Sequence, residues 1–331
     1  MTVQNPANAR TREANSLLKR LNSTNLLGPI IALILASAFF ATQSERFLTG
    51  QNFSLILQQV MVVGVMAIGQ TLIILTAGID LSCGMVMVLG TMVMTKLAVE
   101  SGMNPFVAIL AGTLVSTAVG FLNGLLVTKI KLPPFIVTLG TYNIAFAITQ
   151  IYSNAQTQTG LPEALTFFGN TFHIGNTAIT YGTVLMLLMY VLIWVFLTRT
   201  APGRHIYAVG NNPEAARLTG IPTNKVLLFV YTFAGFIYSI AGLLLVARTG
   251  VGDPNAGATD NLDTITAVVL GGTSLFGGRG LIYGTLLGAL IVGVFRNGLT
   301  LTGVPSVYQI LITGILVILA VAADQLTRKK A

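Results

Sequence analysis

The chain has 331 residues, of which 53% are hydrophobic and only 8% carry a charge. A soluble domain carries about 25% charged residues, so this composition predicts a polytopic membrane protein. The net charge of +8 does not indicate nucleic-acid binding, because the basic residues fall in loops between apolar segments, and the single cysteine, Cys83, excludes an internal disulfide or a cysteine-based metal cluster.

Residues 1–25 are polar and basic, and we expect them on the cytoplasmic side of the membrane. The first apolar run, 26–41, has a basic flank and contains Ala-Ser-Ala at 36–38, features that also suit a cleavable signal peptide. An uncleaved first span is favoured, because the polar leader is long and nine further apolar segments follow. Residues 26–331 are therefore expected to form a single transmembrane domain.

The apolar segments predict ten transmembrane helices, so the predicted fold class is all-α. The spans are expected at about 26–41, 55–76, 83–98, 105–127, 135–152, 179–198, 226–247, 262–276, 281–298 and 305–323. With the N-terminus inside, most Lys and Arg residues fall in inner loops, and the exceptions near the outer side are Arg46, Lys96, Arg248 and Arg296. This bias agrees with the positive-inside rule and predicts that both termini are cytoplasmic. Arg296 is expected to extend its side chain toward the outer surface.

Two outer segments, 153–178 and 248–262, are long and contain acidic residues. The first contains Glu163 and no Lys or Arg, and the second contains Asp253 and Asp260. These segments are either solvated connections or the surface on which a soluble basic partner lands.

The loop at 199–225 is the longest polar and basic interruption of the apolar pattern, and it predicts a short helix of its own. The start and stop signals are, in order, a cap at Asn211 or Asn212, Pro213 at the first helical position, Glu214 in the first turn, Arg217, and Gly220 with Pro222 at the end. Glu214 and Arg217 are three residues apart, so they share a face and suit the helix dipole. Such a helix is either a preformed docking element or an ordinary surface helix.

A weak internal repeat relates the two ends of the chain. The segment from Gly78 to Gly84 resembles 272–278, and Gly90-Thr91 after it resembles Gly284-Thr285. Further on, Asn123-Gly124-Leu125 resembles Asn297-Gly298-Leu299. The repeat predicts two related halves, at about 55–152 and 226–323, with a transport pathway between them. The glycines expected to have a structural or gating role are Gly78, Gly84, Gly271, Gly272, Gly277 and Gly278, although close helix packing would also explain them.

No motif for covalent chemistry is present. The glycine-rich stretch 271–280 lacks the lysine of a phosphate-binding loop, and we interpret it as a broken helix and turn. No metal-ligand spacing or nucleophile elbow appears, so the chain is not expected to be an enzyme or to bind a cofactor.

Polar residues within the apolar segments are few and mostly uncharged. Asp80 either belongs to a proton or cation relay or, as we favour, caps the helix that begins near Leu81 at the cytoplasmic edge. The residues expected to line a pathway are Gln58, Gln59, Gln70, Asn123, Thr138, Asn143 and Asn297. Neutral amides and hydroxyls suit an uncharged polyhydroxylated solute, and they equally suit hydrogen bonds between helices.

Four motifs in order give the chain a family resemblance: GIDLSCG at 78–84, KLPPFIVTLGT at 131–141, GNNPEAARLTGI at 210–221 and VVLGGTSLFGGRG at 268–280. Together they resemble the permease subunits of bacterial monosaccharide ABC importers of the ribose and fructose type, within the family shared with branched-chain amino-acid permeases. The resemblance covers nearly the whole chain after the first span.

The resemblance implies a homodimeric permease of the inner membrane that takes a neutral monosaccharide from a periplasmic binding protein. It implies that a separate cytoplasmic subunit binds ATP and Mg and drives transport. It also implies that residues 210–220 are the coupling helix that enters a cleft on that ATPase, where Ala215, Ala216 and Leu218 would supply burial while Glu214 and Arg217 set orientation. The residues assigned to coupling are Asn211, Asn212, Pro213, Glu214, Ala215, Ala216, Arg217, Leu218 and Gly220.

The alternative hypothesis is a stand-alone secondary sugar transporter driven by a proton or sodium gradient, which would require Asp80. An intramembrane enzyme is a third possibility, and it would need a polar catalytic cluster that the sequence does not contain. Pentoses and ketohexoses both remain candidate substrates.

Overall fold

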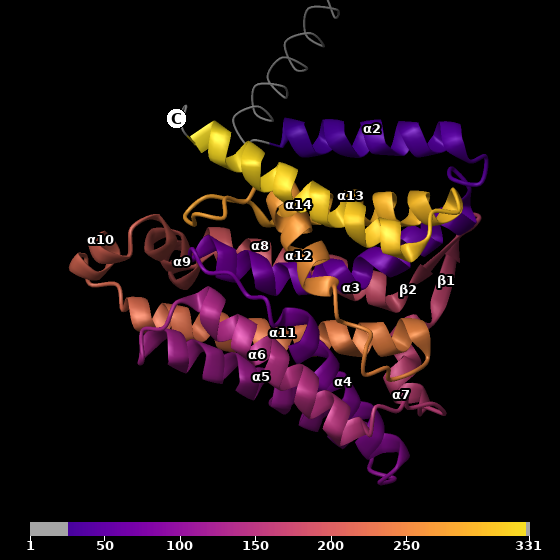
Figure 1. Ribbon diagram of the computed structural model, residues 1–331, viewed down its shortest axis with the longest axis horizontal. Coiled ribbons are helices and arrows are strands. Elements are labelled where there is room, and N and C mark those ends of the chain that lie inside the picture. The colour runs from indigo at the N-terminus through magenta and orange to yellow at the C-terminus, as the bar shows by residue number, and fades with distance from the viewer. Residues whose placement is uncertain (1–25, 329–331) are drawn as a thin grey trace, which may run out of the picture.

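The apolar segments form helices that run lengthwise through the molecule, most of them side by side (Figure 1). The computed structural model describes residues 26–328, so the predicted polar segment 1–25 lies outside the described part. In chain order the elements are α2 (Leu27–Gln43), α3 (Gly50–Leu75), α4 (Cys83–Val99), α5 (Pro105–Thr128), α6 (Pro134–Ser153), α7 (Glu163–Thr166), the 3-10 turn η1 (Phe167–Gly169), β1 (Thr171–Ile174), β2 (Thr177–Thr180), α8 (Tyr181–Arg199), α9 (Ala201–Asn211), α10 (Pro213–Leu218), α11 (Thr223–Thr249), α12 (Asp260–Leu270), α13 (Ile282–Leu301) and α14 (Ser306–Arg328).

Each of the ten predicted spans contains a helix. Six of the described helices are long and apolar enough to cross a membrane, namely α3, α5, α6, α8, α11 and α13. The helices α2 and α4, and α14 from Ser306 to Ala322, are apolar but shorter, and α12 has only 11 residues. The described chain is a polytopic, all-α membrane protein, as predicted, with one short β-hairpin added.

The eighth predicted span, 262–276, is wrong beyond Leu270, where α12 ends. The backbone after this helix has positive φ angles at Gly272, Gly277 and Gly278. Glycine adopts this left-handed conformation readily, whereas a right-handed helix excludes it. The stretch at 271–280 is therefore a loop, in agreement with its interpretation as a break and turn.

The helices α4 and α12 are short because both begin inside the molecule. After α11, residues 250–259 turn back inward, and the backbone of Gly257 lies against Gly84 at the start of α4. Asn261 on α12 donates a hydrogen bond from Nδ2 to the carbonyl of Leu81 (3.2 Å). The N-terminal ends of the two helices thus meet in the interior, an arrangement in which transport proteins place their pathways.

This inward turn corrects the prediction that 248–262 is an acidic surface loop. Asp260 and Asp263 are each 6% exposed, so a soluble partner has no access to them. Asp253 is half-buried, whereas Glu163 on α7 is exposed. Of the acidic groups in the two predicted outer segments, Glu163 is the one that remains fully available at the surface.

The central helix of the molecule is α3, which is buried from Val60 to Leu75. It packs against α8, α11, α12 and α13. On the other side of α11, the backbone of Gly120 in α5 lies against that of Gly235. Small residues permit this close approach of two helices, which is the usual means of packing where the surrounding solvent is lipid.

Several short elements were not predicted from the sequence, among them α7, η1, α9 and the β-hairpin. The helix α9 follows α8 with only Thr200 between them, and the Thr200 hydroxyl caps it by accepting a hydrogen bond from the amide of Gly203 (3.2 Å). The strands β1 and β2 pair antiparallel, and Phe172 stacks on Tyr181 at the start of α8 with ring centroids 5.9 Å apart. Strands of four residues are too short for an alternating pattern to be recognised.

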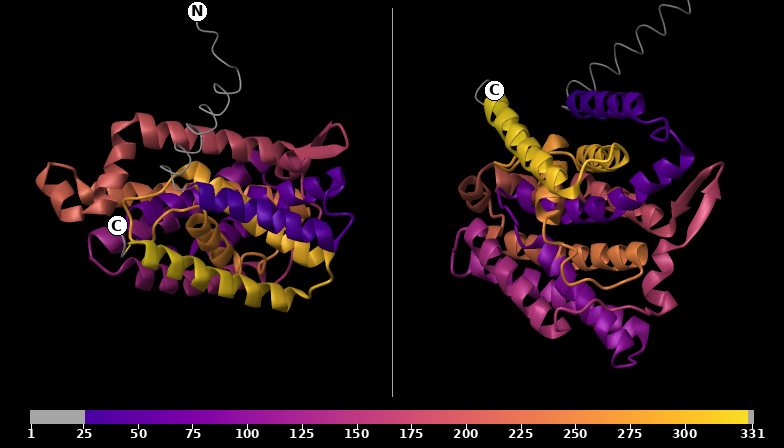
Figure 2. Two further views of the ribbon diagram at one scale, coloured as in Figure 1. Left: turned by 90° about the horizontal axis from the view of Figure 1, so that it is seen from above. Right: turned by 45° about the vertical axis from the view of Figure 1, so that its right-hand side comes forward.

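The two ends of the molecule differ in character. The helices α9 and α10 lie at one end, and the β-hairpin and α7 lie at the other (Figure 1). The helix α14 ends on the side of α9 and α10, and it lies on the face opposite α8 (Figure 2). The loop 199–225 and the end of α14 thus lie at the same end of the molecule, and their cytoplasmic location stays a prediction.

The predicted internal repeat matches Gly90 with Gly284 and Asn123 with Asn297. Gly284 and Asn297 lie on one helix, α13, whereas Gly90 lies on α4 and Asn123 on α5. The two matched blocks therefore do not pair equivalent helices, and the division into halves at about 55–152 and 226–323 stays a prediction.

Candidate functional site

The short helix expected in the loop 199–225 is α10. Its N-cap is Asn212, whose Oδ1 accepts a hydrogen bond from the amide of Ala215 (3.0 Å), and Pro213 occupies the first turn. Asn211 is the last residue of α9 and does not cap α10. Local signals were sufficient here, because a cap, a proline and a terminating Gly220 with φ of +88° act within a few residues of one another.

The exposed face of α10 carries one ion pair and one large apolar side chain. Arg217 donates hydrogen bonds to both carboxylate oxygens of Glu214, at 2.6 and 3.1 Å. Both side chains are mostly exposed, and Leu218 is 74% exposed. Ala216 is only 5% exposed, because α10 packs against α9 and α11, so Ala216 stabilises the fold and is not available to supply burial to a partner as expected.

The charge of Arg217 and its hydrogen bond lower the pKa of Glu214 below its ordinary value of 4.5. A lowered pKa means that folding favours the carboxylate form. The ion pair is therefore complete above pH 4.5 and is lost only as the pH falls below that value. Near neutral pH the ion pair on the exposed face of α10 therefore does not change with pH.

The end of α9 is joined to the loop 271–280 by backbone contacts. The amide of Gly278 donates a hydrogen bond to the carbonyl of Leu75, the last residue of α3 (2.9 Å). A Cβ atom on Gly278 would lie 2.7 Å from the Cα of Asn211. The ends of α3 and α9 and the loop before α13 therefore meet at a point with room for glycine alone.

Gly210 and Gly277 complete this contact, which we call the glycine junction (Gly210, Gly277 and Gly278 with Leu75 and Asn211). A Cβ on Gly277 would lie 2.8 Å from the backbone nitrogen of Ala77 and from the carbonyl oxygen of Gly210. A Cβ on Gly210 would meet the carbonyl of Leu75. Two of the glycines assigned to gating thus contact the segment assigned to coupling, although they are more than 60 residues apart in the chain.

The loop 271–280 is also held from two other sides. Tyr207 on α9 donates a hydrogen bond to the carbonyl of Gly280 (3.0 Å), and burial raises the pKa of Tyr207 to about 12, so its hydroxyl remains a donor at neutral pH. Asp324 on α14 accepts hydrogen bonds from the hydroxyl of Ser274 and the amide of Leu275, both at 3.2 Å. The loop 271–280 therefore contacts α3, α9 and α14, and it leads directly into α13.

Of the other four glycines assigned to gating, three pack closely against neighbouring atoms and one is exposed at the surface. Gly84 lies against Gly257, Gly271 packs on the backbone of Gly284, and a Cβ on Gly78 would lie 2.7 Å from the hydroxyl oxygen of Tyr231. Gly272 is exposed, with φ of +85°. The structure thus separates these four from the glycine junction.

Asp80 does not cap a helix. The helix α4 begins at Cys83, and Oδ1 of Asp80 accepts hydrogen bonds from the amide and the hydroxyl of Ser82, at 2.7 and 2.6 Å. The prediction of a cap is therefore wrong by two residues, because Asp80 closes a turn between α3 and α4. Its side chain is buried, with 2% of its surface exposed.

Two of the residues predicted to line a pathway surround this turn. Asn123 donates a hydrogen bond to the hydroxyl of Ser82 (3.2 Å) and accepts one from Thr141 (2.6 Å). Thr138 donates to the carbonyl of Ile79 (3.1 Å). These bonds tie α5 and α6 to the turn before α4.

The remaining predicted lining residues are dispersed. Gln70 accepts a hydrogen bond from Tyr238 (3.4 Å), Asn297 donates to Asn52 (2.8 Å), and Gln58 donates to Ser54 (3.2 Å). Gln59 has a buried Oε1 atom that makes no hydrogen bond within residues 26–328. Asn143 on α6 is exposed and donates to the carbonyl of Leu139 (3.1 Å). Their role in a pathway stays a prediction.

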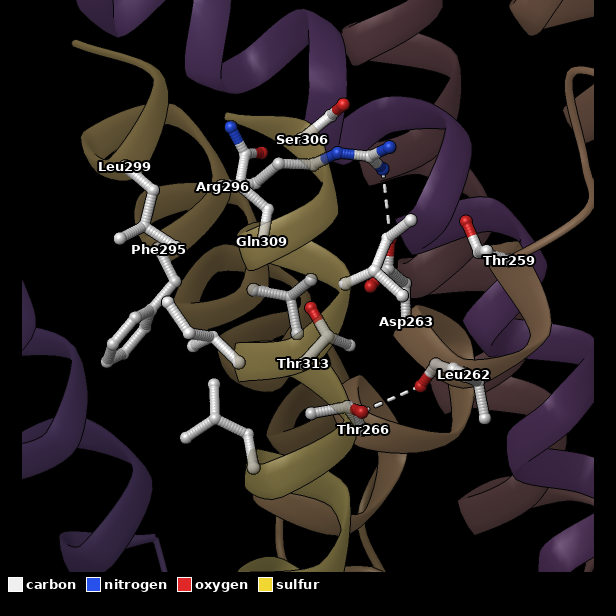
Figure 3. Close-up of a pocket in the computed structure, with 14 residues that line it drawn as sticks. Thr259, Leu262, Asp263, Thr266, Phe295, Arg296, Leu299, Ser306, Gln309 and Thr313 are labelled. Carbon is white, nitrogen blue, oxygen red and sulfur yellow. Dashed lines mark hydrogen bonds and ion pairs between the residues drawn. The ribbon is translucent and has the colours of Figure 1, made fainter. Parts of the chain in front are cut away.

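One polar site was missed by the sequence analysis. Arg296 on α13 donates a hydrogen bond to Oδ2 of Asp263 on α12 (2.9 Å), beside a cavity of about 100 Å³ (Figure 3). The side chain of Arg296 is 46% exposed, so its expected extension toward the surface is not contradicted, but the ion pair with Asp263 was not predicted. Charged residues inside apolar spans are costly and usually functional, and this rule applied to both residues would have identified the site.

Comparisons with known proteins agree on one family. The family model described as "Branched-chain amino acid transport system / permease component" matches residues 52–321. The chain is 46% identical to the fructose import permease protein FrcC of Rhizobium meliloti over 94% of this chain and 88% of that protein. It is 39% identical to the ribose import permease protein RbsC of Bacillus subtilis over 97% of this chain and 99% of that one, and 38% identical to the D-allose transport system permease protein AlsC of Escherichia coli over 91% of each. No solved structure matches the chain.

Proposed function

Because the chain belongs to the family of branched-chain amino acid transport system permease components, in which its relatives are import permeases and not enzymes, we propose that it carries a neutral monosaccharide into the cytoplasm. In this proposal a periplasmic binding protein delivers the sugar, and a separate ATPase, which binds ATP and Mg, drives the transport. Two copies of the chain form the permease in the inner membrane, with both termini cytoplasmic. The relatives that transport fructose, ribose and allose favour a hexose or pentose substrate.

The observation that carries the proposal is the link between α10 and the membrane helices. An exposed helix at one end of the molecule is joined, through α9, to the glycine junction. A partner that binds α10 differently in two nucleotide states would shift the equilibrium between two arrangements of the helices. No cofactor is needed in this chain, and within residues 26–328 no group of three metal-ligating side chains is present.

The mechanism follows from the contacts of the junction. The ATPase moves α10 and α9 as one unit, because Ala216 and the Asn212 cap hold α10 in place. The movement reaches the end of α3 through Leu75 and the start of α13 through the loop 271–280. The turn at Asp80, which follows α3, then shifts the start of α4, and α4 meets α12 in the interior. Sugar passes without any covalent step.

The test is uptake of labelled fructose and labelled ribose into proteoliposomes. We expect uptake only when the chain is combined with its ATPase, ATP and the sugar-binding protein. The control is the chain alone under an imposed proton gradient. Uptake by the isolated chain under that gradient would contradict the proposal and would favour a secondary transporter, for which Asp80 would be the residue to study.

The ion pair on α10 gives a specific prediction. Glu214→Lys should lower ATP-driven uptake roughly tenfold, because like charges at an interface cost free energy, while the amount of permease in the membrane stays the same. The reciprocal variant Arg217→Glu should act in the same way.

The charge-swapped double variant, Glu214→Arg with Arg217→Glu, is the control for this prediction. It keeps an ion pair within α10 but reverses its direction. Uptake that stays low in the double variant supports a contact with the partner. Full recovery would show that the pair serves only to stabilise α10, and unchanged uptake in both single variants would argue against docking through this face.

A further inference from the structure

A cavity between α12, α13 and α14 brings polar side chains from three helices together in an otherwise apolar region (Figure 3). Asp263 of α12, Arg296 of α13 and Thr313 of α14 all line this cavity (Figure 3). The apolar part of the lining includes Phe295 and Leu299. A mostly apolar cavity with a few convergent polar groups is the usual form of a small-molecule site.

The polar groups of the cavity have unused hydrogen-bonding capacity. Within residues 26–328, the guanidinium of Arg296 donates one hydrogen bond, to Asp263, although an arginine has five N–H donors. The Thr313 hydroxyl makes no hydrogen bond in that part of the chain, and it lines the cavity. The spare donors and acceptors therefore point to a ligand that can both donate and accept hydrogen bonds.

The charge of the site selects against ions. Asp263 and Arg296 neutralise each other, since their oxygen and nitrogen atoms are 2.9 Å apart. A cation or an anion would have to disrupt this pair, whereas adjacent hydroxyl groups can donate to the carboxylate and accept from the guanidinium without separating them. An uncharged polyol fits this arrangement.

The place of the cavity in the fold indicates the side from which a ligand arrives. Arg296 lies near the end of α13, and Ser306, which also lines the cavity, is the first residue of α14. The end of α13 and the start of α14 lie toward the end of the molecule that carries the β-hairpin, away from α9 and α10 (Figure 1). The Arg296 side chain is 46% exposed, so the cavity is accessible from the surface.

We propose that this cavity binds one edge of the incoming monosaccharide, through the Thr313 hydroxyl and the Arg296–Asp263 pair. A cavity of about 100 Å³ is several times the roughly 10–15 Å³ that one water molecule requires, so it has room for several hydroxyl groups of a sugar. The site would receive sugar released on the outer side. This inference rests on the proposed sugar import, which it extends to named contacts.

The first experiment removes one hydroxyl and nothing else. Thr313→Val should raise the KM for uptake of labelled fructose or ribose, measured in the complete ATP-driven system, by about fivefold to tenfold, the effect of one lost hydrogen bond. The maximal rate should change little. The matched control is Thr232→Val on α11, whose hydroxyl donates to the carbonyl of Leu228 (2.7 Å) and does not line the cavity, and it should leave the KM unchanged.

The second experiment separates binding from structure. The double variant Asp263→Asn with Arg296→Gln removes both charges, so neither is left unpaired. We expect the double variant to reach the membrane at the normal level and to lose sugar uptake by more than about tenfold, as two contacts are weakened. If the double variant fails to reach the membrane, the KM measured for Thr313→Val is the test of whether the cavity contacts the sugar.

The outcomes distinguish this inference from the proposed function. If the wild-type system imports sugar and Thr313→Val has the wild-type KM, the cavity is not a sugar contact, and the proposed function stands. If the wild-type system imports neither sugar but imports labelled leucine, the proposed function fails, and this inference fails with it. Fructose or ribose import with a raised KM in Thr313→Val supports both.

Discussion

Replacing Gly278 by alanine should lower ATP-driven sugar uptake on the order of 100-fold. Gly278 has a φ angle of +71°, and a side chain in this left-handed region costs about 1–2 kcal/mol. Its Cβ would also lie 2.7 Å from the Cα of Asn211, and overpacking against rigid backbone adds about 1–3 kcal/mol. The strain and the overpacking together are sufficient to break the contact between the loop 271–280 and α9. Because a factor of ten corresponds to about 1.4 kcal/mol, their sum accounts for a loss of uptake on the order of 100-fold.

Gly303 provides a matched control for this prediction. It has a φ angle of +76°, close to that of Gly278, but a Cβ there would meet nothing within 4 Å. Gly303→Ala should therefore cost only the backbone strain and should leave uptake within a few fold of wild type. Equal losses in the two variants would show that strain in the backbone, and not the contact with α9, accounts for the effect.

The nature of the defect can be measured as well as its size. In Gly278→Ala the face of α10 is unchanged, so we expect the ATPase to remain bound to the permease. ATP hydrolysis should continue, whereas its stimulation by the sugar-loaded binding protein should be lost. A variant that releases the ATPase would contradict the assignment of the glycine junction to transmission.

The parts of the fold that depend on local sequence could be predicted. Apolar length identified all ten helical segments, and cap residues identified α10, because both signals act within one element. The helix α12 was predicted to run to residue 276 but ends at Leu270, and the inward turn of residues 250–259 before it was not predicted. That turn is stabilised by contacts with Gly84 and Leu81, far away in the chain.

In the candidate site, too, local features could be predicted from the sequence, whereas contacts between distant residues could not. The glycines at 277 and 278 were noticed as a break in a helix, but spacing in the sequence could not show that they contact Gly210 and Leu75. Arg296 and Asp263 are 33 residues apart on different helices, so neither indicated the other. Asp80 was assigned to a cap because the helix start was placed two residues too early, and its partner Ser82 is in fact local.

The second large effect is expected at Leu218 on α10. Leu218 is 74% exposed, and it is the last residue of α10, which lies at the end of the molecule beyond the lengthwise helices (Figure 1). Full burial of a leucine stabilises a contact by about 1.5–3 kcal/mol, and a charge buried in its place is costly. Leu218→Asp should therefore weaken binding of the ATPase and lower ATP-driven uptake on the order of 100-fold.

Two controls belong to this prediction, which is measured by the amount of ATPase that co-purifies with the permease. Leu218→Met keeps the apolar contact and should retain the ATPase. Ile174→Asp places the same charge on another exposed apolar residue, 62% exposed, in β1 at the opposite end of the molecule. It should leave the ATPase bound. Retention of the ATPase and of uptake in Leu218→Asp would contradict docking through α10.

The two predictions together separate docking from transmission. Leu218→Asp should lose the ATPase, whereas Gly278→Ala should keep it and lose only the link between ATP hydrolysis and uptake. The distinction follows from geometry, because Leu218 faces solvent while Gly278 faces the backbone of α9 and α3. If both variants lost the ATPase, the glycine junction would act by holding α10 in position, and the movement of the helices would have to reach the pathway by another route.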